Sequence, residues 1–407
     1  MERNIVICSD GTGNTFDKSV SNVTRLIKLL ALDKSQEQIV VYDQGIGTNA
    51  RRLDAVKDYH KSIPDKDSLI ILDGPKAWRF APVGRLASLL GLAIGYGFKA
   101  NVREMYKILS QLYEGPDDKI YLFGFSRGAF TVRALAGLLY RCGLPGKNVG
   151  EDEKKFKACF GEAYDLFKPI LYEPIREKIA NKILAFRDKY SVRDCTITIH
   201  FLGVWDTVKS YGGVWPKLLP HLRHNPHVKI MRHALALNER RSWFNATTWG
   251  RLDLDDKGAA LRLTKTELDE LKKQGIEEVW FRGCHSDIGG GDAEANTAKI
   301  ALRWMLGEAA AARVRLNDDG KMMLKDDDPP GPVEIHESLR GLWWLTEYLP
   351  RWEIDNSGKY PVRKFKWRRT GRRNPDDLTR NGKILLHTRV GNLHSISVPV
   401  EYWPTKV

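Results

Sequence analysis

The chain has 407 residues, of which 42% are hydrophobic, and it carries a formal net charge of +14. This length and apolar content provide for a large buried core and exclude a disordered chain or a small disulfide-stapled domain. Five scattered cysteines, an odd number, argue against a disulfide framework and favour a reducing compartment.

The amino-terminal residues predict a strand instead of a targeting segment. The apolar run "NIVICS" at 4–9 begins almost at the first residue, so no signal peptide is expected. The longest apolar run, at 86–98, has 13 residues. That is too short to span a bilayer, which takes about 20 residues. We therefore expect a soluble, cytoplasmic protein, which reaches other compartments only by non-classical export.

Strands and helices alternate along most of the chain. Apolar runs predict strands, and these lie at 4–9, 38–43, 119–123, 196–204 and 278–282. Apolar residues at helical spacing predict helices, and these follow 21–22, cover 101–113, follow residue 126 and include 298–305. Such alternation is typical of the α/β class, with a mainly parallel sheet and helices on both faces.

Composition divides the chain into a core and an extension. Residues 1–312 are predicted to form the core, with insertions or a cap at 44–100 and 147–192. The first insertion is rich in charge, glycine and proline up to residue 85, and the second is helical and charged. Residues 313–407 are predicted to be an irregular, aromatic and basic extension packed on the core.

A serine between two glycines follows the apolar run at 119–123. In the stretch "GFSRG", Gly124 and Gly128 permit a sharp turn from strand to helix that lifts the hydroxyl of Ser126 clear of the sheet. The following helix directs its free N–H groups and positive dipole end at the same place. Ser126 is therefore predicted to be a nucleophile. The alternative is a serine that only forms the turn.

Two other strand ends provide a base and an acid. A serine hydroxyl needs a histidine base, and the histidine needs an acid that fixes its tautomer. Asp206 follows the run at 196–204 and His285 follows the run at 278–282, in the chain order of α/β-hydrolases. Asp287 competes for the acid role but lies only two residues from His285. The alternatives are a helix-capping role for Asp206 and a structural role for His285.

The loop "SDGTGN" after the first strand predicts the remaining part of such a site. An oxyanion needs two N–H donors, and one usually comes from the loop after a neighbouring strand. Gly11 and Thr12 are predicted to supply that donor, and Arg127, directly after the serine, supplies the other. Asp10 is expected to hold the loop by hydrogen bonds.

Six segments together resemble one family: "SDGTGNT", "YDQGIGT", "YLFGFSRGAFTVRALAGLL", "FLGVWDTV", "WFRGCHSDIGGG" and "IHESLRGLWWLTEYLP". It is the α/β-hydrolase family of formerly unknown function that includes the catalytic domain of class-one type VI secretion phospholipase effectors. The resemblance implies lipase or esterase chemistry with Ser126, Asp206 and His285 as a triad. It also implies a lipid or ester substrate and a secretion-apparatus or immunity protein as partner. We expect no cofactor and no metal.

The C-terminal extension contains a dense basic run. The stretch "RKFKWRRTGRR", at 363–373, interleaves arginine and lysine with Phe365 and Trp367. Such a run favours an anionic membrane surface, because cations meet headgroups while aromatic rings enter the interface. Nucleic acid is a less favoured partner. The alternative is a solvated basic surface, which is the ordinary role of a charge run.

Three other functions compete with the hydrolase. A metal-dependent phosphoesterase would use oxygen and nitrogen ligands, drawn from Asp10, His285, Asp287 and Asp292. A haloacid-dehalogenase-type phosphatase would need an aspartate nucleophile where the sequence has Cys8. A non-enzymatic protein would bind nucleic acid or membrane through its basic C-terminal part on a hydrolase scaffold.

Overall fold

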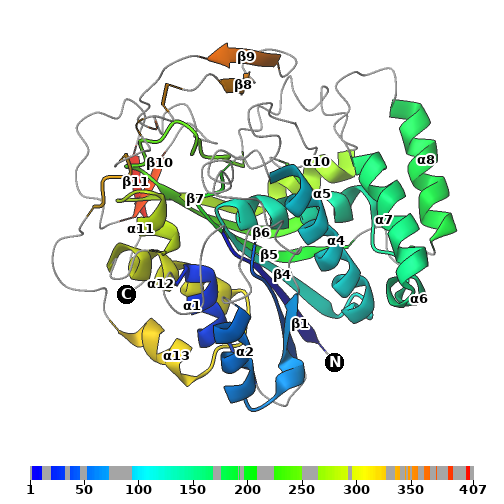
Figure 1. Ribbon diagram of the computed structural model, residues 1–407, viewed down its shortest axis with the longest axis horizontal. Helices are drawn as coiled ribbons and strands as arrows, with labels where there is room; N and C mark the ends of the chain where they lie inside the picture. The colour runs from blue at the N-terminus through cyan, green and yellow to red at the C-terminus, as the bar shows by residue number, and fades with distance from the viewer. Residues whose placement is uncertain are drawn as a thin grey trace.

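A nine-stranded sheet forms the centre of the protein (Figure 1). The computed structural model describes residues 2–11, 20–32, 37–45, 53–72, 94–167, 176–190, 192, 197–208, 224–249, 265–291, 296–326, 335–339, 344, 347–348, 351–355, 362–366, 373, 384–387 and 400–403.

The strands of this sheet run in the order β11-β10-β7-β6-β5-β4-β1-β2-β3, and every neighbouring pair is parallel. Their bounds are β1 (Arg3–Ser9), β2 (Gln38–Asp43), β3 (Leu69–Leu72), β4 (Asp118–Phe125), β5 (Ile199–Trp205), β6 (Val228–Ala236), β7 (Gly275–Phe281), β10 (Ile384–His387) and β11 (Val400–Trp403). The predicted α/β-hydrolase-like fold with a parallel sheet is confirmed.

Helices cover both faces of the sheet (Figure 1). One face carries α4 (Ile94–Leu112), α5 (Arg127–Cys142), α6 (Lys147–Glu151), α7 (Glu153–Phe167) and α8 (Arg176–Lys189). The other carries α1 (Asn22–Leu29), α12 (Asn296–Ala311) and α13 (Asp318–Lys325). The remaining elements are α2 (Leu53–Ser62), a short 3₁₀ helix (Lys66–Ser68), α10 (Lys265–Lys273), α11 (His285–Gly289) and the antiparallel pair β8 (Arg351–Asp355) and β9 (Val362–Lys366).

Alternate residues of β1 enter two separate cores. Ile5 and Ile7 of β1 pack with α4 and α5, whereas Val6 and Cys8 pack with α1 and α12. A strand that is buried on both faces needs apolar side chains on both, so its sequence is one continuous apolar run. This explains why β1, β2, β4 and β5 are recognisable in the sequence, and β7 is recognisable from its buried last three residues.

Two strands differ from the sequence prediction. The segment 44–85 was expected to be a loop or insertion, but it contains α2 and the edge strand β3. Strand β6 lies in a stretch that gave no strand signal, because Arg232 and His233 interrupt its apolar pattern. Both side chains have acidic partners: Arg232 Nε donates to Glu308 at 2.7 Å, and His233 Nδ1 lies 2.9 Å from Glu278. The apolar run at 86–98 lies mostly outside the described residues.

The C-terminal part of the chain contributes to the sheet. Strands β10 and β11 come from the predicted extension and continue the sheet beyond β7. The division of the chain at residue 312 stays a prediction. Of the basic run at 363–373, the structure describes the part in β9 and Arg373. Residues 367–372 lie outside the described residues.

No helix among the described ranges is long and apolar enough to cross a membrane. The compartment stays a prediction.

The strand order reverses between β1 and β4. From β1 the chain proceeds to β2 and β3 on one side, and from β4 it proceeds to β5, β6 and β7 on the other. In open α/β sheets, ligands bind at the carboxyl ends of the strands where this reversal occurs. Gly11 follows β1 and Ser126 follows β4, so both lie at this point.

Candidate active site

Ser126 occupies the sharp turn between β4 and α5. Its φ of 57° and ψ of −117° are unusual for a residue with a side chain, and such strain is typical of a nucleophile on a strand-to-helix turn. The neighbouring glycines are required by space. A Cβ on Gly128 would lie 2.1 Å from the Ser9 carbonyl oxygen, and one on Gly124 would lie 2.7 Å from the backbone of Ala129.

His285 is the first residue of α11 and faces Ser126. Its Nε2 atom lies 2.8 Å from Ser126 Oγ. The imidazole lies between two aromatic rings, with centroid distances of 4.7 Å to Phe125 and 4.9 Å to Phe244. A Cβ on Gly289 would overlap the ring of Phe125, so glycine is needed there for α11 to pack on it. These contacts fix the orientation of the histidine ring.

Asp206 follows β5 and is fully buried behind the histidine. Its Oδ2 atom lies 2.5 Å from His285 Nδ1. The residue adopts a φ of 38°, a left-handed value that is uncommon for a residue other than glycine. Its backbone N–H donates to Ala234 at 2.8 Å, and its Oδ1 accepts from the N–H of Ala236 at 3.0 Å. Strand β6 therefore forms hydrogen bonds with both the backbone N–H and the carboxylate of Asp206.

These contacts assign the protons of the site. A carboxylate only accepts hydrogen bonds, so His285 Nδ1 carries a proton and Nε2 is left to accept the Ser126 hydroxyl. Burial lowers the pKa of His285 below its ordinary value, against the opposing effect of Asp206. The imidazole is therefore neutral around neutral pH, which is the form that accepts a proton from serine.

Arg373 makes the most extensive contact with Asp206. Its Nη1 lies 2.5 Å from Oδ1 and its Nη2 lies 3.0 Å from Oδ2, a two-pronged contact. Burial favours the neutral form of Asp206, but Arg373 and His285 outweigh it and hold the pKa of this carboxyl well below its ordinary range. Asp206 is therefore an anion. This also corrects an expectation, since Arg373 ends the basic run that was predicted to face a membrane.

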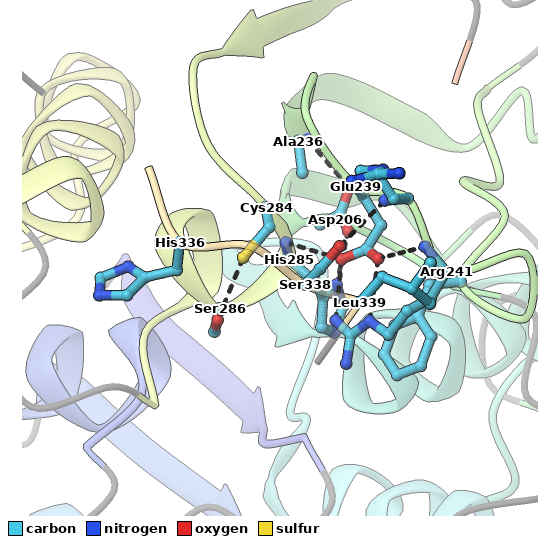
Figure 2. A network of polar contacts seen from close by, with 12 residues as sticks. Asp206, Ala236, Glu239, Arg241, Cys284, His285, Ser286, His336, Ser338 and Leu339 are labelled. Carbon is cyan, nitrogen blue, oxygen red and sulfur yellow. Dashed lines mark hydrogen bonds and ion pairs between the residues drawn. The ribbon is translucent and has the colours of Figure 1, made fainter. Parts of the chain in front are cut away.

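Glu239 supports the histidine from a third direction (Figure 2). Its Oε2 accepts from the backbone N–H of His285 at 3.1 Å and from Arg241 Nη2 at 2.8 Å. Burial raises the pKa of Glu239, but hydrogen bonds from Arg241 outweigh this and bring it down to about 2. The Arg241 guanidinium also lies 3.7 Å from the centroid of Phe244, the ring that packs on the imidazole.

Asp287 faces away from the imidazole of His285. Its Oδ2 accepts from the backbone N–H groups of Cys284 and His336, at 2.9 and 3.1 Å. Its Oδ1 lies 2.5 Å from His336 Nδ1, and Figure 2 shows His336 on the other side of Cys284 from Asp206. Asp287 therefore caps α11 and binds the segment at 335–339.

Asp10 accepts several hydrogen bonds at the start of the loop after β1, and one of them comes from an amide that was predicted to bind the oxyanion. Asp10 accepts from Ser21 Oγ at 2.8 Å, from Tyr42 at 3.2 Å and from the N–H of Gly11 at 2.6 Å. In this conformation the Gly11 amide therefore points at Asp10 and not at an oxyanion. Thr12 lies outside the described residues. Arg127 begins α5, and its N–H is one of the four that a helix leaves without an intrahelical partner.

The three described ligands of the alternative metal site, Asp10, His285 and Asp287, do not form a metal-binding group. No group of three potential metal-binding side chains occurs in the described part of the chain. Asp10, His285 and Asp287 each have the separate partners given above, and Asp292 lies outside the described residues. For the alternative phosphatase, Cys8 is fully buried in the core beside α1, and burial raises the pKa of its thiol.

Residues 3–308 match the family described as "T6SS, Phospholipase effector Tle1-like, catalytic domain". The chain belongs to this family. The match begins with β1 and ends within α12, and therefore includes Ser126, Asp206 and His285. Arg373 and His336 lie beyond it.

One curated relative is the "Uncharacterized protein YEL023C" of Saccharomyces cerevisiae, which is 31% identical over 245 residues. The alignment covers 60% of this chain and 32% of that protein. The Tle1-like chain therefore spans about a third of the length of this relative.

Two solved structures are distant likenesses. One is an uncharacterized protein from Pseudomonas aeruginosa, with 18% identity and a TM-score of 0.38 over 79% of this chain and 48% of that chain. The other is the Tle1 effector bound to the VgrG spike of the type 6 secretion system, with 19% identity and a TM-score of 0.28 over 73% and 52%. At these scores neither likeness assigns a role to a residue.

Sequence reasoning missed part of the site of this Tle1-like protein. Glu239 and Phe244 follow β6, the strand that was not predicted, so nothing marked them as strand-end residues. His336 lies in the quoted segment "IHESLRGLWWLTEYLP", which marked it as a family feature without a role. Nothing in the sequence distinguished Arg373 from the other basic residues of its run.

Proposed function

We propose that the protein is a serine hydrolase of the lipase or esterase type that cleaves carboxylic ester bonds of phospholipids. One observation carries the proposal: Ser126 Oγ lies 2.8 Å from His285 Nε2, and Nδ1 of the same ring lies 2.5 Å from the Asp206 carboxylate. These are the distances and the order of contacts that nucleophile activation by a histidine base requires. The family adds phospholipid as the substrate class.

The proposed reaction has two halves. Ser126 Oγ attacks the ester carbonyl carbon while its proton passes to His285 Nε2. The tetrahedral intermediate collapses, the imidazolium protonates the departing alkoxide, and an acyl group remains on the serine. Water then gives a proton to His285 and attacks the acyl group. The second intermediate collapses, the imidazolium returns the proton to Ser126 Oγ, and a fatty acid is released. Asp206 stabilises the imidazolium in both halves without itself taking a proton.

The oxyanion of each intermediate needs donors that are already in place. The N–H of Arg127 and the dipole of α5 lie next to Ser126, and a helix N-terminus favours negative charge. We propose Arg127 as the first donor and Thr12 as the donor from the loop after β1. Gly11 would contribute only if its amide leaves Asp10.

Labelling with a fluorophosphonate probe tests this function. The probe reacts with an activated serine, so the wild type should be labelled at Ser126 and the Ser126→Ala variant should not. Peptide mass spectrometry locates the modified residue. Ser62→Ala, which removes an exposed hydroxyl at the end of α2, is the matched control and should label like the wild type.

Labelling that persists in Ser126→Ala would contradict the proposal. Loss of ester turnover in EDTA would favour the metal-dependent alternative.

We also propose that the enzyme works on an anionic lipid surface. Trp344 and Tyr348 are exposed to 43% and 52%, and Trp and Tyr favour the membrane interface. Between them, Glu347 accepts from the backbone N–H of Ser242 at 2.8 Å, which connects this segment to the loop that carries Phe244. The net charge of +14 complements anionic headgroups.

Liposome co-sedimentation checks this surface. Replacing Trp344 and Tyr348 by Ser should reduce binding to anionic liposomes while turnover of a soluble short-chain ester is retained. Leu184→Ser, at an apolar residue on α8 that is at least as exposed, is the control and should bind like the wild type. Binding that ignores lipid charge, or that is stronger to nucleic acid than to liposomes, would contradict the proposal.

For the partners of the whole protein, the family description is the only basis of the proposal. Its members are described as type VI secretion phospholipase effectors, so we propose a secretion-apparatus protein and an immunity protein as partners.

A further inference from the structure

We propose that Arg373 is a positioning residue of this hydrolase, which holds the Asp206 carboxylate in the orientation that serves His285. The inference rests on the function proposed above. It assigns a role in the site to the C-terminal part of the chain, beyond the residues 3–308 that match the family.

The guanidinium contacts the acid and the backbone around it. Its two terminal nitrogens bind the two oxygens of Asp206, at 2.5 and 3.0 Å. Nη1 also donates to the Ala236 carbonyl at 2.9 Å, and Nη2 donates to the Phe244 carbonyl. A planar fork with this many partners has one orientation, so it fixes the plane of the carboxylate as well as its charge.

Asp206 needs such a partner because of its surroundings. It is fully buried, and a buried carboxylate is stable only when it is paired and hydrogen-bonded. Its remaining donors are the N–H of Ala236 and the imidazole of His285. Arg373 is the cation in contact with this carboxylate, and only 5% of its side chain is exposed.

The charge of Arg373 also has a consequence for the histidine. The charged and titratable groups around the dyad are Glu239, Arg241, Arg373 and, from β6, His233. Without the guanidinium, the charge of Asp206 would be unbalanced and would favour the protonated imidazole. The pKa of His285 would rise, so the enzyme would lose its base at a higher pH than the wild type.

Three variants separate position from charge. Arg373→Met removes the charge and the fork, and should lower kcat by about 10- to 100-fold, the range for partners that orient the ligands of a metal site. It should also move the acid limb of kcat/KM upward by about one pH unit. Arg373→Lys keeps the charge, so its acid limb should stay at the wild-type pH while kcat is partly retained. Arg103→Gln, which removes a charge on the α4 surface, is the control and should change neither quantity.

A thermal unfolding series tests the contact without reference to activity. Arg373→Met leaves a buried charge unpaired and should lower the melting temperature, and adding Asp206→Asn should raise it again. A double variant that is no more stable than Arg373→Met would overturn the proposal, and so would a wild-type pH profile in Arg373→Met. Neither result would change the expected fluorophosphonate labelling of Ser126, so the proposed function would stand. Conversely, absent labelling with an intact stability series would reject the hydrolase and keep the Arg373–Asp206 pair.

Discussion

The Ser126→Ala variant is expected to lose ester turnover by about six orders of magnitude, the loss found when a triad serine is removed from a hydrolase. The physical reason is that alanine offers no atom for the covalent intermediate, so only unassisted attack by water remains. The fold should persist, because the Ser126 side chain does not cap α5 and its backbone can keep the turn. Steady-state kinetics on a soluble short-chain ester give kcat, and circular dichroism checks the fold.

A second substitution shows whether the serine and histidine act as one unit. Adding His285→Ala to Ser126→Ala should reduce the remaining rate very little, because the base has no nucleophile left to activate. Full activity in a folded Ser126→Ala variant would end the serine hydrolase proposal. A large further loss in the double variant would show that His285 acts by another route.

The Asp206→Asn variant is expected to lose about four orders of magnitude in kcat, by analogy with the acid of a serine protease triad. An amide at this place can present its NH₂ group to His285 Nδ1. The proton would then move to Nε2, and the imidazole could no longer accept the proton of Ser126. The shape of the residue is conserved, so the loss measures the tautomer and charge and not a cavity. Single-turnover kinetics on the same ester measure it.

Asp287→Asn is the matched control for this variant. Asp287 is equally buried and lies closer in sequence to His285, but its oxygens are taken by Cys284 and His336. Its replacement should lower the melting temperature while kcat falls far less than in Asp206→Asn. The reverse ranking of the two losses would reassign the acid to Asp287.

Four of the strands that the sequence predicted share one property: nearly all of their residues, on both faces, are buried. An apolar run is the result in β1, β2, β4 and β5, whereas β7 shows it only at Val279, Trp280 and Phe281. The strand β3 has only four residues at the edge of the sheet, too few for a pattern. In β6, charged side chains take part in ion pairs with residues far away in sequence, such as Arg232 with Glu308. A local pattern contains no information about such partners.

The residues of the site also divide into those that a local sequence pattern marks and those that depend on distant partners. Ser126 and Asp206 follow directly on strands and His285 lies shortly after another. Parallel strands bring their carboxyl ends together, so the sequence predicted that the three would meet. Arg373 belongs to no strand or helix and lies 167 residues from Asp206. Its neighbours in sequence are basic, which favoured a solvated or membrane-facing role. Only the folded chain shows that it turns inward.

The position of Arg373 in the sequence has a consequence for the biosynthesis of the enzyme. A ribosome makes the chain from its amino end, and domains fold as their residues emerge. The serine, the aspartate and the histidine are all translated before Arg373, because they precede it in the sequence. On the role proposed for Arg373, a nascent chain has its nucleophile and its base but lacks the cation that holds its acid. On that role and on the proposed lipid substrate, translation order delays full activity until the chain has been made past Arg373, which limits the exposure of the producing cell's own lipids to shorter growing chains.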